Sequence, residues 1–576
     1  MNGEEIKTIS TVIILKQVLG LPEGENFILI LDDVTMSLVN SVCGQFALLD
    51  RVMEHIQSKR DCVSGVTAIY FVEPTERNVG LILDDFMEIK SFVGAESCID
   101  RIIYCGMEDV SGESCLYDKV ALRFKGDLSD ELAGRILNNQ VLQKRLNTRL
   151  IHMNYHIEES NVAVTNIPSA LKDIWGKNDA TGILLRIAKS LVHMCVALGI
   201  KPLVHYQCGY PCKDIADLFE SEVNLIMLQY IANFQPTLRE KGQLLLIDRT
   251  IDPLVPLLHP INYQPMAEDL LSIGEGGEFD YRSETSQEIR KVLLDDNDRI
   301  WNAYRYEHIL TTISSLKEAA KRFLESTQES KNTIQDISNL IKTLPENKQR
   351  KELFALHISI AQMCIDQFRE RSLTKLIPLE QVIVTGYDEA GSSPNAEKLL
   401  KEVESIRLLL IYAIAQGMDV ATQQRLFSLS GVGMEYSSIL SNLSMLGVKL
   451  SQPMEQRLDK KEHLKRVKQM CREGGMIMNR YDSQIRYCLN DLITNALSPS
   501  KFEVYDTGTS PLRDIIGVDM SRSREMEWYG KPGKKPVTIT GDPIVCYIVG
   551  GTCYAEIESL NELAEGIGRN VTIGER

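Results

Sequence analysis

The first 150 residues alternate between short apolar runs and longer segments in which apolar positions recur every three or four residues. The runs are Phe27–Leu31, Thr67–Val72, Ile102–Cys105 and Leu150–Tyr155. Such a run, bounded by polar residues, is typical of a strand buried on both faces of a parallel sheet, and the spacing between runs is typical of amphipathic helices. This alternation predicts a doubly wound α/β domain over residues 1–150.

A second α/β unit begins after the first and lacks part of its sheet. Residues 151–252 are rich in helical patterns and contain two candidate strands, Leu203–Tyr206 and Leu244–Ile247. A further buried run, Val545–Val549, lies near the other end of the sequence and precedes two glycines and a helical pattern. We therefore expect one discontinuous domain, made of residues 151–252 and 478–576, with the rest of the chain inserted between its halves.

The inserted segment is mostly helical in pattern. Ile309–Phe323 and Leu353–Phe368 carry apolar residues at helical spacing, and a shorter pattern between them, Ile334–Leu344, stops before Pro345. Proline lacks a backbone N–H and clashes with the preceding turn, so it commonly ends a helix. The pattern predicts a long helical hairpin with a bent tip at Pro345. The expected units of the insertion are 253–370, which holds the hairpin, and 371–477.

A group of charged residues follows the run Leu244–Ile247, namely Asp248, Arg249 and Asp252. Open α/β sheets usually place active sites at the carboxyl ends of their strands, so the two aspartates could serve an α/β enzyme as an acid pair. No G-x-S-x-G, Walker or H-E-x-x-H pattern accompanies them, and the glycine pair Gly550–Gly551 has no G-x-G-x-x-G. We favour a structural interpretation, in which a buried aspartate–arginine network fixes the angle between two domains.

Composition narrows the possible functions. The chain has 576 residues, of which 44% are hydrophobic and 25% charged, as expected for several globular domains. Its net charge of −16 argues against nucleic-acid binding, because phosphate contacts need a basic surface. The 13 cysteines are scattered without zinc spacing, so we expect reduced thiols and neither metal nor cofactor. No apolar stretch approaches the roughly 20 residues of a membrane span, which predicts a cytoplasmic protein without direct membrane insertion.

Four stretches together resemble the Sec-one/Munc-eighteen (SM) family of syntaxin-binding SNARE regulators. They are LIDRTIDPLVPLLHP with YQPMAEDLL within 243–273, VLLDDNDRIWNAYRYEHI at 292–309, AIYFVEPTERNV at 68–79 and CYIVGGTCYAEI at 546–557. The first two are most similar to the exocytic, plasma-membrane branch. The resemblance implies an arch-shaped fold of three domains with no enzymatic activity, and a monomeric protein that SNAREs recruit to the periphery of the target membrane.

The function implied by this resemblance is regulation of SNARE assembly. Such a protein binds a syntaxin-type Qa-SNARE and promotes or regulates assembly with a vesicle R-SNARE, for vesicle docking and fusion in exocytosis. It would also bind the assembled SNARE complex. An SM protein of another trafficking step, endosomal, vacuolar or Golgi, is the alternative.

The resemblance also implies contact positions in the first domain. Glu54 stands at an acidic syntaxin-contact position, whereas Ser37 and Gly44 stand where the exocytic branch has basic residues. Neither a hydroxyl nor a hydrogen replaces a cation in an ion pair, so these two residues argue against the tight mode that holds closed syntaxin. A surface for the syntaxin N-terminal peptide would include Ala133, with Ile136 and Leu137. Because Ala133 replaces an aromatic residue of neuronal relatives, a plain surface helix is the interpretation we favour.

In the helical hairpin, the resemblance places a surface that aligns SNARE helices. The implied residues are Leu344, Pro345, Leu353, His357 and Ile358, with Pro345 as a hinge between a folded-back and an extended state. A surface that holds two helices in register lowers the entropic cost of their encounter. A basic cluster at 457–472 is a solvated helix face or a contact for acidic SNARE or lipid groups.

Overall fold

The computed structural model describes most of the chain. The described residues are 5–20, 26–43, 52–58, 60, 65–86, 117, 119–143, 146–176, 179–232, 239–282, 289–329, 334–388, 390–400, 405–451, 453–454, 464–465, 467–468, 480–505, 543–569 and 571–574. Gly44, the run Ile102–Cys105 and most of the basic cluster at 457–472 lie outside these ranges. Within the described part, no helix is both long and apolar enough to cross a membrane.

The first unit is built on a five-stranded parallel sheet in the order β2-β1-β3-β4-β5. Its central strand β3 is buried along its whole length, which explains its continuous apolar sequence. Helices α2 (Asp33–Cys43), α3 (Glu76–Asp84) and α5 (Asp130–Leu137) follow strands of this sheet. The strands are β1 (Phe27–Leu31), β2 (Val52–His55), β3 (Thr67–Val72), β4 (Lys119–Lys125) and β5 (Leu146–Ile151).

Two strands of this sheet, β1 and β3, match the predicted ranges, and two other features differ. The predicted strand Leu150–Tyr155 is wrong beyond Ile151, because Met153 and Tyr155 leave the sheet and pack into the core below it. Strand β4 was not predicted, because the charged residues of its sequence, KVALRFK, interrupt the apolar run. Its Arg123 is fully buried, since it donates hydrogen bonds to the carbonyls of Gln17 and Asn147.

The second unit is built on a seven-stranded sheet that joins distant parts of the sequence. Strand β9 (Arg239–Asp248) lies parallel to β13 (Ile544–Val549), with Gln243 opposite Ile544 and Asp248 opposite Val549. The sheet is parallel from β8 to β7 and antiparallel at both edges. Its other strands are β12 (Phe502–Val504), β8 (Ile200–Gln207), β14 (Val571–Gly574), β7 (Val162–Val164) and β6 (His156–Glu159).

The predicted α/β class, with two parallel sheets and a helical insertion, is confirmed by this arrangement. Helices α8 (Thr181–Ala197) and α9 (Cys212–Ala232) pack against β8 of the second sheet, and α20 (Gln484–Ile493) packs against α23 (Tyr554–Ile567). The insertion contains one two-stranded antiparallel hairpin, β10 (Glu278–Arg282) with β11 (Ile289–Leu293). Its main helices are α10 (Tyr263–Leu270), α11 (Arg299–Tyr304), α12 (Ile309–Glu329), α13 (Ile334–Glu370), α14 (Leu373–Thr385), α16 (Ile406–Gln416), α17 (Val420–Ser430) and α18 (Ser437–Met445).

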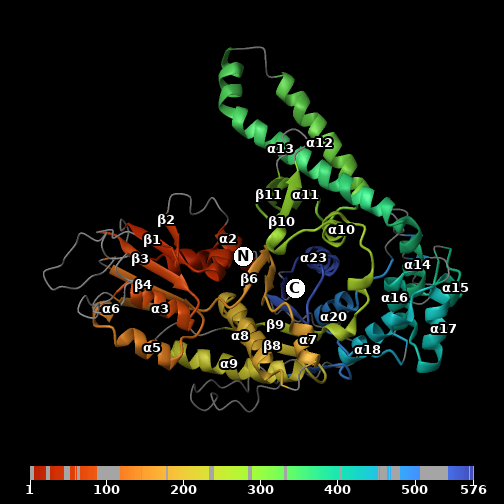
Figure 1. Cartoon of the computed structure of the whole chain (residues 1–576), viewed down its shortest axis with the longest axis horizontal. Coiled ribbons are helices and arrows are strands. Elements are labelled where there is room, and N and C mark those ends of the chain that lie inside the picture. Colours follow the sequence, from red (N-terminus) through yellow and green to blue (C-terminus); the bar gives the residue numbers. More distant parts are fainter. Residues whose placement is uncertain are drawn as a thin grey trace, which may run out of the picture.

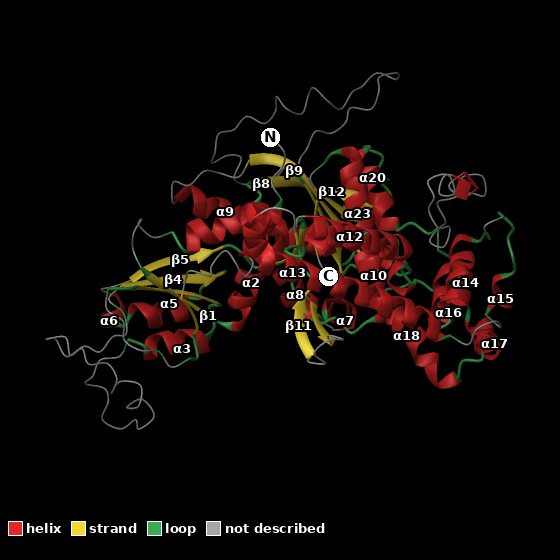
Figure 2. Cartoon of the chain, turned by 90° about the horizontal axis from the view of Figure 1, so that it is seen from above, coloured by secondary structure: helices red, strands yellow, loops and turns green. Residues whose placement is uncertain are grey.

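The three parts are arranged in a row, with the second sheet in the middle (Figures 1 and 2). Helices α14 to α18 form the end opposite the first sheet, while α12 and α13 project together from the centre. The predicted break at Pro345 is wrong for this conformation, because α13 is one helix of 37 residues that continues through this position. The hairpin is therefore formed by two helices, α12 and α13, and α13 changes direction near its projecting end (Figure 1).

Candidate partner-binding cleft

Helix α2 presents an uncharged polar face toward the centre of the molecule. The helix begins where the Asp32 carboxylate accepts a hydrogen bond from the backbone N–H of Thr35 at 2.8 Å. Its apolar side chains, among them Leu38 and Val42, are buried in a core that the first and second units share. The opposite face carries Ser37 and Asn40, which are exposed one turn apart.

This face of α2 lines one side of a cleft of about 560 Å³. The other side is formed by the β10–β11 hairpin and the chain that follows it, including Val292, Leu293 and Leu294. Gly277 makes this wall possible, because its φ of 81° favours glycine and a Cβ there would lie 2.5 Å from the carbonyl oxygen of Leu294. Ser41 adds to the α2 wall, and the cleft is also lined by Lys7, Ile157, Glu158, Glu159, Gln264, Trp301, Arg305 and Tyr554.

Asp296 connects all three parts beside this cleft. Its carboxylate accepts a hydrogen bond from Lys7 of the first unit at 3.2 Å and from Ser160 of the second unit at 3.0 Å. It also accepts one from Arg305 of the insertion at 2.8 Å. Burial opposes ionisation of Asp296, but the two cations outweigh it and lower the pKa of this carboxyl. The sequence offered no signal for this role beyond a run of acids at the start of a helix.

Glu159 extends the same network beneath the cleft. It accepts a hydrogen bond from Gln264 at 2.8 Å and another from the hydroxyl of Tyr306, and it lies 3.6 Å from Arg305. Burial raises the pKa of Glu159, while Arg305 and the hydrogen bonds oppose this shift. Lys7, Arg305 and Glu159 therefore pair within the protein, while the hairpin side of the cleft also carries Glu278, Lys291 and Asp295.

The structure separates the contact residues expected in the first unit. Ser37 lines the cleft, Gly44 lies outside the described residues, and Glu54 is half-buried on the edge strand β2. The cleft-lining residues that the structure describes do not include Glu54. Residues Asn40 and Ser41, which were not identified from the sequence, lie beside Ser37 because helical spacing places them on the same face.

The expected N-terminal-peptide surface is only partly available on α5. Leu137 is 56% exposed and Ala133 is half-buried. Ile136, by contrast, is 3% exposed and belongs to the core of the first unit, so its placement on a binding surface is corrected. Helical geometry is the reason, because adjacent residues point in different directions and only one of Ile136 and Leu137 faces outward.

The charged group after β9 forms a buried junction, with one partner that differs from the prediction. Arg249 pairs with Glu556 of α23 at 2.6 Å and 2.7 Å rather than with the side chain of either aspartate. Asp248 instead accepts a hydrogen bond from the backbone N–H of Thr250. Glu556 could have been noticed as the third residue of a helix start, where it also accepts from the Cys553 N–H.

Asp252 joins the two halves of the second unit. Its carboxylate accepts a hydrogen bond from the backbone N–H of Gln484 at 2.7 Å and another from Leu254 at 3.1 Å. Burial raises the pKa of Asp252 to about 6, although Arg249 opposes this effect. Both oxygens hold backbone groups in place, which agrees with a structural role. Within the described ranges, no group of three or more potential ligands could hold a metal ion.

The residues expected on the hairpin surface are placed unequally. Leu353 and Ile358 are half-buried on α13, while the side chains of Leu344 and Pro345 lie outside the described part. His357 is fully buried, and its expected place on the surface is corrected. Its ring contacts the Asp298 carboxylate at 2.8 Å and the Tyr263 hydroxyl at 2.9 Å, so it fixes α13 to the base of the insertion.

Comparison with known proteins gives consistent matches along the whole chain. The model of the Sec1 family matches residues 27–574. The chain is 24% identical to "Protein transport protein sec1" of Dictyostelium discoideum, over 96% of this chain and 93% of that protein. It is also 24% identical to "SNARE-interacting protein KEULE" of Arabidopsis thaliana, over 95% and 89%.

Solved structures show the same fold at low sequence identity. The Unc18–syntaxin 1 complex from Monosiga brevicollis matches with a TM-score of 0.77 at 18% identity, covering 99% of this chain and 96% of that chain. The SM protein Vps45, solved in complex with the Qa SNARE Tlg2, matches with a TM-score of 0.73 at 17% identity, covering 99% and 95%.

Proposed function

This chain belongs to the Sec1 family, and we propose that it binds a syntaxin-type Qa-SNARE in the cleft between α2 and the β10–β11 hairpin. The observation that carries this proposal is the cleft itself, which is 560 Å³ in volume and is walled by two separate parts of the protein. Structures with the same fold have been solved with syntaxin or a Qa SNARE bound. Binding there regulates assembly of the SNARE complex.

The lining of the cleft suits a helix recognised mainly by hydrogen bonds and apolar contacts. On α2 the available groups are the hydroxyl of Ser37 and the amide of Asn40, and on the opposite wall they are Val292 and Leu293. An amphipathic SNARE helix can place small polar residues toward α2 and apolar residues toward β11. The absence of a basic residue at Ser37 favours this mode over one that depends on ion pairs.

The second part of the proposal concerns the projecting helices α12 and α13. They extend away from both sheets, where a vesicle R-SNARE or an assembled SNARE complex could reach them (Figure 1). Half-buried Leu353 and Ile358 are the candidate contacts, whereas buried His357 positions the helix. We assign the chain to exocytosis, with recruitment to the plasma membrane through SNAREs. The alternative is another trafficking step, since Vps45 and SLY1 are also similar.

Filling the cleft tests the proposal. Asn40→Trp places a large side chain in the cleft, and we expect it to weaken binding of a purified syntaxin cytosolic fragment at least tenfold in calorimetry. The control is Gln140→Trp, which adds the same group at an exposed position on α6 (Gln140–Gln143). Equal syntaxin affinity of the two variants would contradict the proposal that syntaxin binds in the cleft. Comparing plasma-membrane with endosomal syntaxins on the unmodified protein then decides between the two pathways.

A further inference from the structure

The segment that joins the two sheets is held by helix α8. This segment runs from β5 of the first sheet to β6 of the second and includes Asn154. The backbone N–H of Asn154 donates to Nδ1 of His193 at 3.2 Å, and its carbonyl accepts from the Ser190 hydroxyl at 2.6 Å. Both side chains are almost fully buried, at 2% exposed for His193 and 4% for Ser190. One peptide between the sheets therefore depends on two groups of α8.

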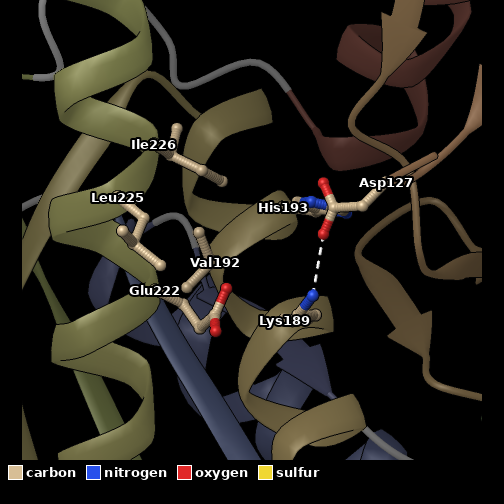
Figure 3. Close-up of a pocket in the computed structure, with 7 residues that line it drawn as sticks. All are labelled: Asp127, Lys189, Val192, His193, Glu222, Leu225 and Ile226. Atoms are coloured by element: carbon tan, nitrogen blue, oxygen red, sulfur yellow. Dashed lines mark hydrogen bonds and ion pairs between the residues drawn. The ribbon is translucent and has the colours of Figure 1, made fainter. Parts of the chain in front are cut away.

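A second contact fixes the first sheet to the same helix. Asp127, which follows β4, pairs with Lys189 of α8 at 2.7 Å beside a cavity of about 160 Å³ (Figure 3). Gly126 packs so closely that a Cβ would lie 2.7 Å from the side-chain oxygen of Asn154. The loop after β4, the connecting segment and α8 thus meet at one point.

Two histidine rings at this point are joined by one hydrogen bond. His193 Nε2 lies 3.3 Å from Nδ1 of His152 in the connecting segment, with ring centroids 5.0 Å apart. Because Nδ1 of His193 accepts from the Asn154 N–H, neutral His193 carries its hydrogen on Nε2 and donates it to His152. An added proton on His152 Nδ1 opposes that donor, and one on His193 Nδ1 opposes the Asn154 N–H. No position for an added proton leaves both hydrogen bonds intact.

We propose that the His152–His193 pair is a proton-sensitive lock between the two sheets, closed when both rings are neutral and opened when either is protonated. Opening frees Asn154 from α8 and lets the first sheet, which carries α2, turn relative to the second. The inference goes beyond the proposed function, because it concerns how the two α/β units are held together and needs no partner.

The charges around the pair come from four elements. They are Lys125 on β4, Asp127 in the loop after it, Lys189 on α8 and Glu222 on α9, which lines the same cavity. Burial lowers the pKa of His193 to about 3, and His152 adds to the shift while Asp127 opposes it. Burial also lowers the pKa of His152, again against Asp127. Lowered histidine pKa values stabilise the closed form above about pH 6.5, and this stabilisation is lost as the pH falls.

The expected size of the effect follows from linkage. If the rings regain an ordinary pKa of about 6.5 when the lock opens, a change from pH 7.5 to 6.0 favours opening about fourfold for one histidine and about 14-fold for two. Hydrogen exchange of the full chain measures this opening directly. The amides to follow are those of residues 152–157 and of the last turns of α8, corrected for the intrinsic pH dependence of exchange.

In the unmodified protein, we expect protection at 152–157 to fall about 4- to 14-fold between pH 7.5 and 6.0. His193→Gln keeps a donor and an acceptor but removes one of the two titrating rings, so its protection should fall by no more than the roughly fourfold left to His152, and the double variant with His152→Gln should show the same protection at both pH values. His205→Gln is the control, because burial also lowers the pKa of His205, to about 4, away from the lock. In His205→Gln, protection at 152–157 should fall between pH 7.5 and 6.0 as it does in the unmodified protein.

Two results would overturn the lock. One is protection at 152–157 that does not change with pH in the unmodified protein, a measurement that depends on no variant. The other is a full pH response retained in His193→Gln, which would assign the response to a neighbouring group such as His156, whose pKa burial and Lys125 lower to about 4. His152→Gln repeats the test from the other ring if His193→Gln does not fold.

Discussion

At the scale of single residues, two buried glutamates on α23 show how neighbouring groups determine whether a carboxyl forms an ion pair. Glu556 pairs with Arg249 through both carboxylate oxygens, which compensates its full burial. Glu558 is 6% exposed and accepts a hydrogen bond from the Asn262 amide instead. Burial raises the pKa of Glu558 to about 8. The same residue type thus forms an ion pair with Arg249 at one position and is a neutral acid near pH 7 at the other.

The raised pKa of Glu558 predicts an effect of its amide analogue on stability. A folded-state pKa above the usual 4.5 contributes stability below pH 4.5 that is lost as the pH rises through 8. Glu558→Gln removes this loss, so its free energy of unfolding should exceed that of the unmodified protein by about 4 kcal/mol more at pH 8.5 than at pH 5. Thermal melts at both pH values, with exposed Glu565→Gln as control, measure the difference. A variant destabilised at pH 8.5 would contradict the assignment.

At the scale of elements, α13 departs most from the expectation. Proline inside a helix removes one hydrogen bond and costs about 3 kcal/mol, yet α13 continues through Pro345. Its C-terminal half explains why the helix is retained there, since Phe354, Leu356 and Ile360 are buried against neighbouring helices. The destabilising effect of Pro345 on α13 is therefore confined to the projecting end of the helix.

Pro345→Ala should strengthen that end of α13. Because alanine restores the missing hydrogen bond, we expect amides near this position to gain protection in hydrogen exchange, by up to about 100-fold for 3 kcal/mol. Amides of α14, which contains its own Pro378, serve as an internal reference. Unchanged protection near residue 345 would mean that proline does not limit the helix there.

A helix break in α13 should separate the two proposed activities. Ser359→Pro removes a backbone donor in the middle of α13 and should reduce stimulated SNARE assembly several-fold more than syntaxin binding. Ser359→Ala, which preserves the helix, is the matched control. Asn40→Trp in the cleft should act in the reverse sense. Equal effects of both variants in the two assays would contradict a division of labour between the first unit and the hairpin.

At the scale of the whole molecule, Asp296 is the point at which all three parts meet. Asp296→Asn keeps a hydrogen-bond acceptor but removes the charge that pairs with Lys7 and Arg305. We expect the free energy of unfolding to fall by about 2 kcal/mol, because largely buried Lys7 loses its anionic partner and Arg305 retains only Glu159. Asp295→Asn, one residue away, lacks these partners and should change stability by less than about 0.5 kcal/mol. Calorimetric melting of both variants measures this contrast.

The charge distribution at the cleft predicts how binding responds to salt. Since Lys7, Arg305 and Lys291 pair within the protein, we expect the dissociation constant of the Qa-SNARE to change less than about threefold between 50 and 300 mM NaCl. Ser37→Arg introduces a cation on α2 and should make binding markedly more salt-dependent. A tenfold rise in the dissociation constant of the unmodified protein over this salt range would show that ion pairs dominate binding.

Local sequence determined those elements whose burial is uniform or regularly periodic. Strands β1, β3 and β13 are continuous apolar runs because both faces of each are covered, and α12 shows its apolar stripe directly. The same logic failed where a polar residue is buried with a partner from elsewhere. Strand β4 was not predicted, because it contains the charged residue Arg123. His357 was assigned to the surface, because its partners Asp298 and Tyr263 are distant in sequence.

What the sequence by itself determined is therefore the α/β class, the helical insertion and the family resemblance, since these depend on patterns within short stretches. Only the tertiary structure decided which charges meet. Asp296 bridges three parts, Arg249 pairs with Glu556, and His193 lies against the segment that joins the sheets. Such contacts form between residues up to 307 positions apart, and their geometry depends on how the sheets pack, which no local pattern encodes.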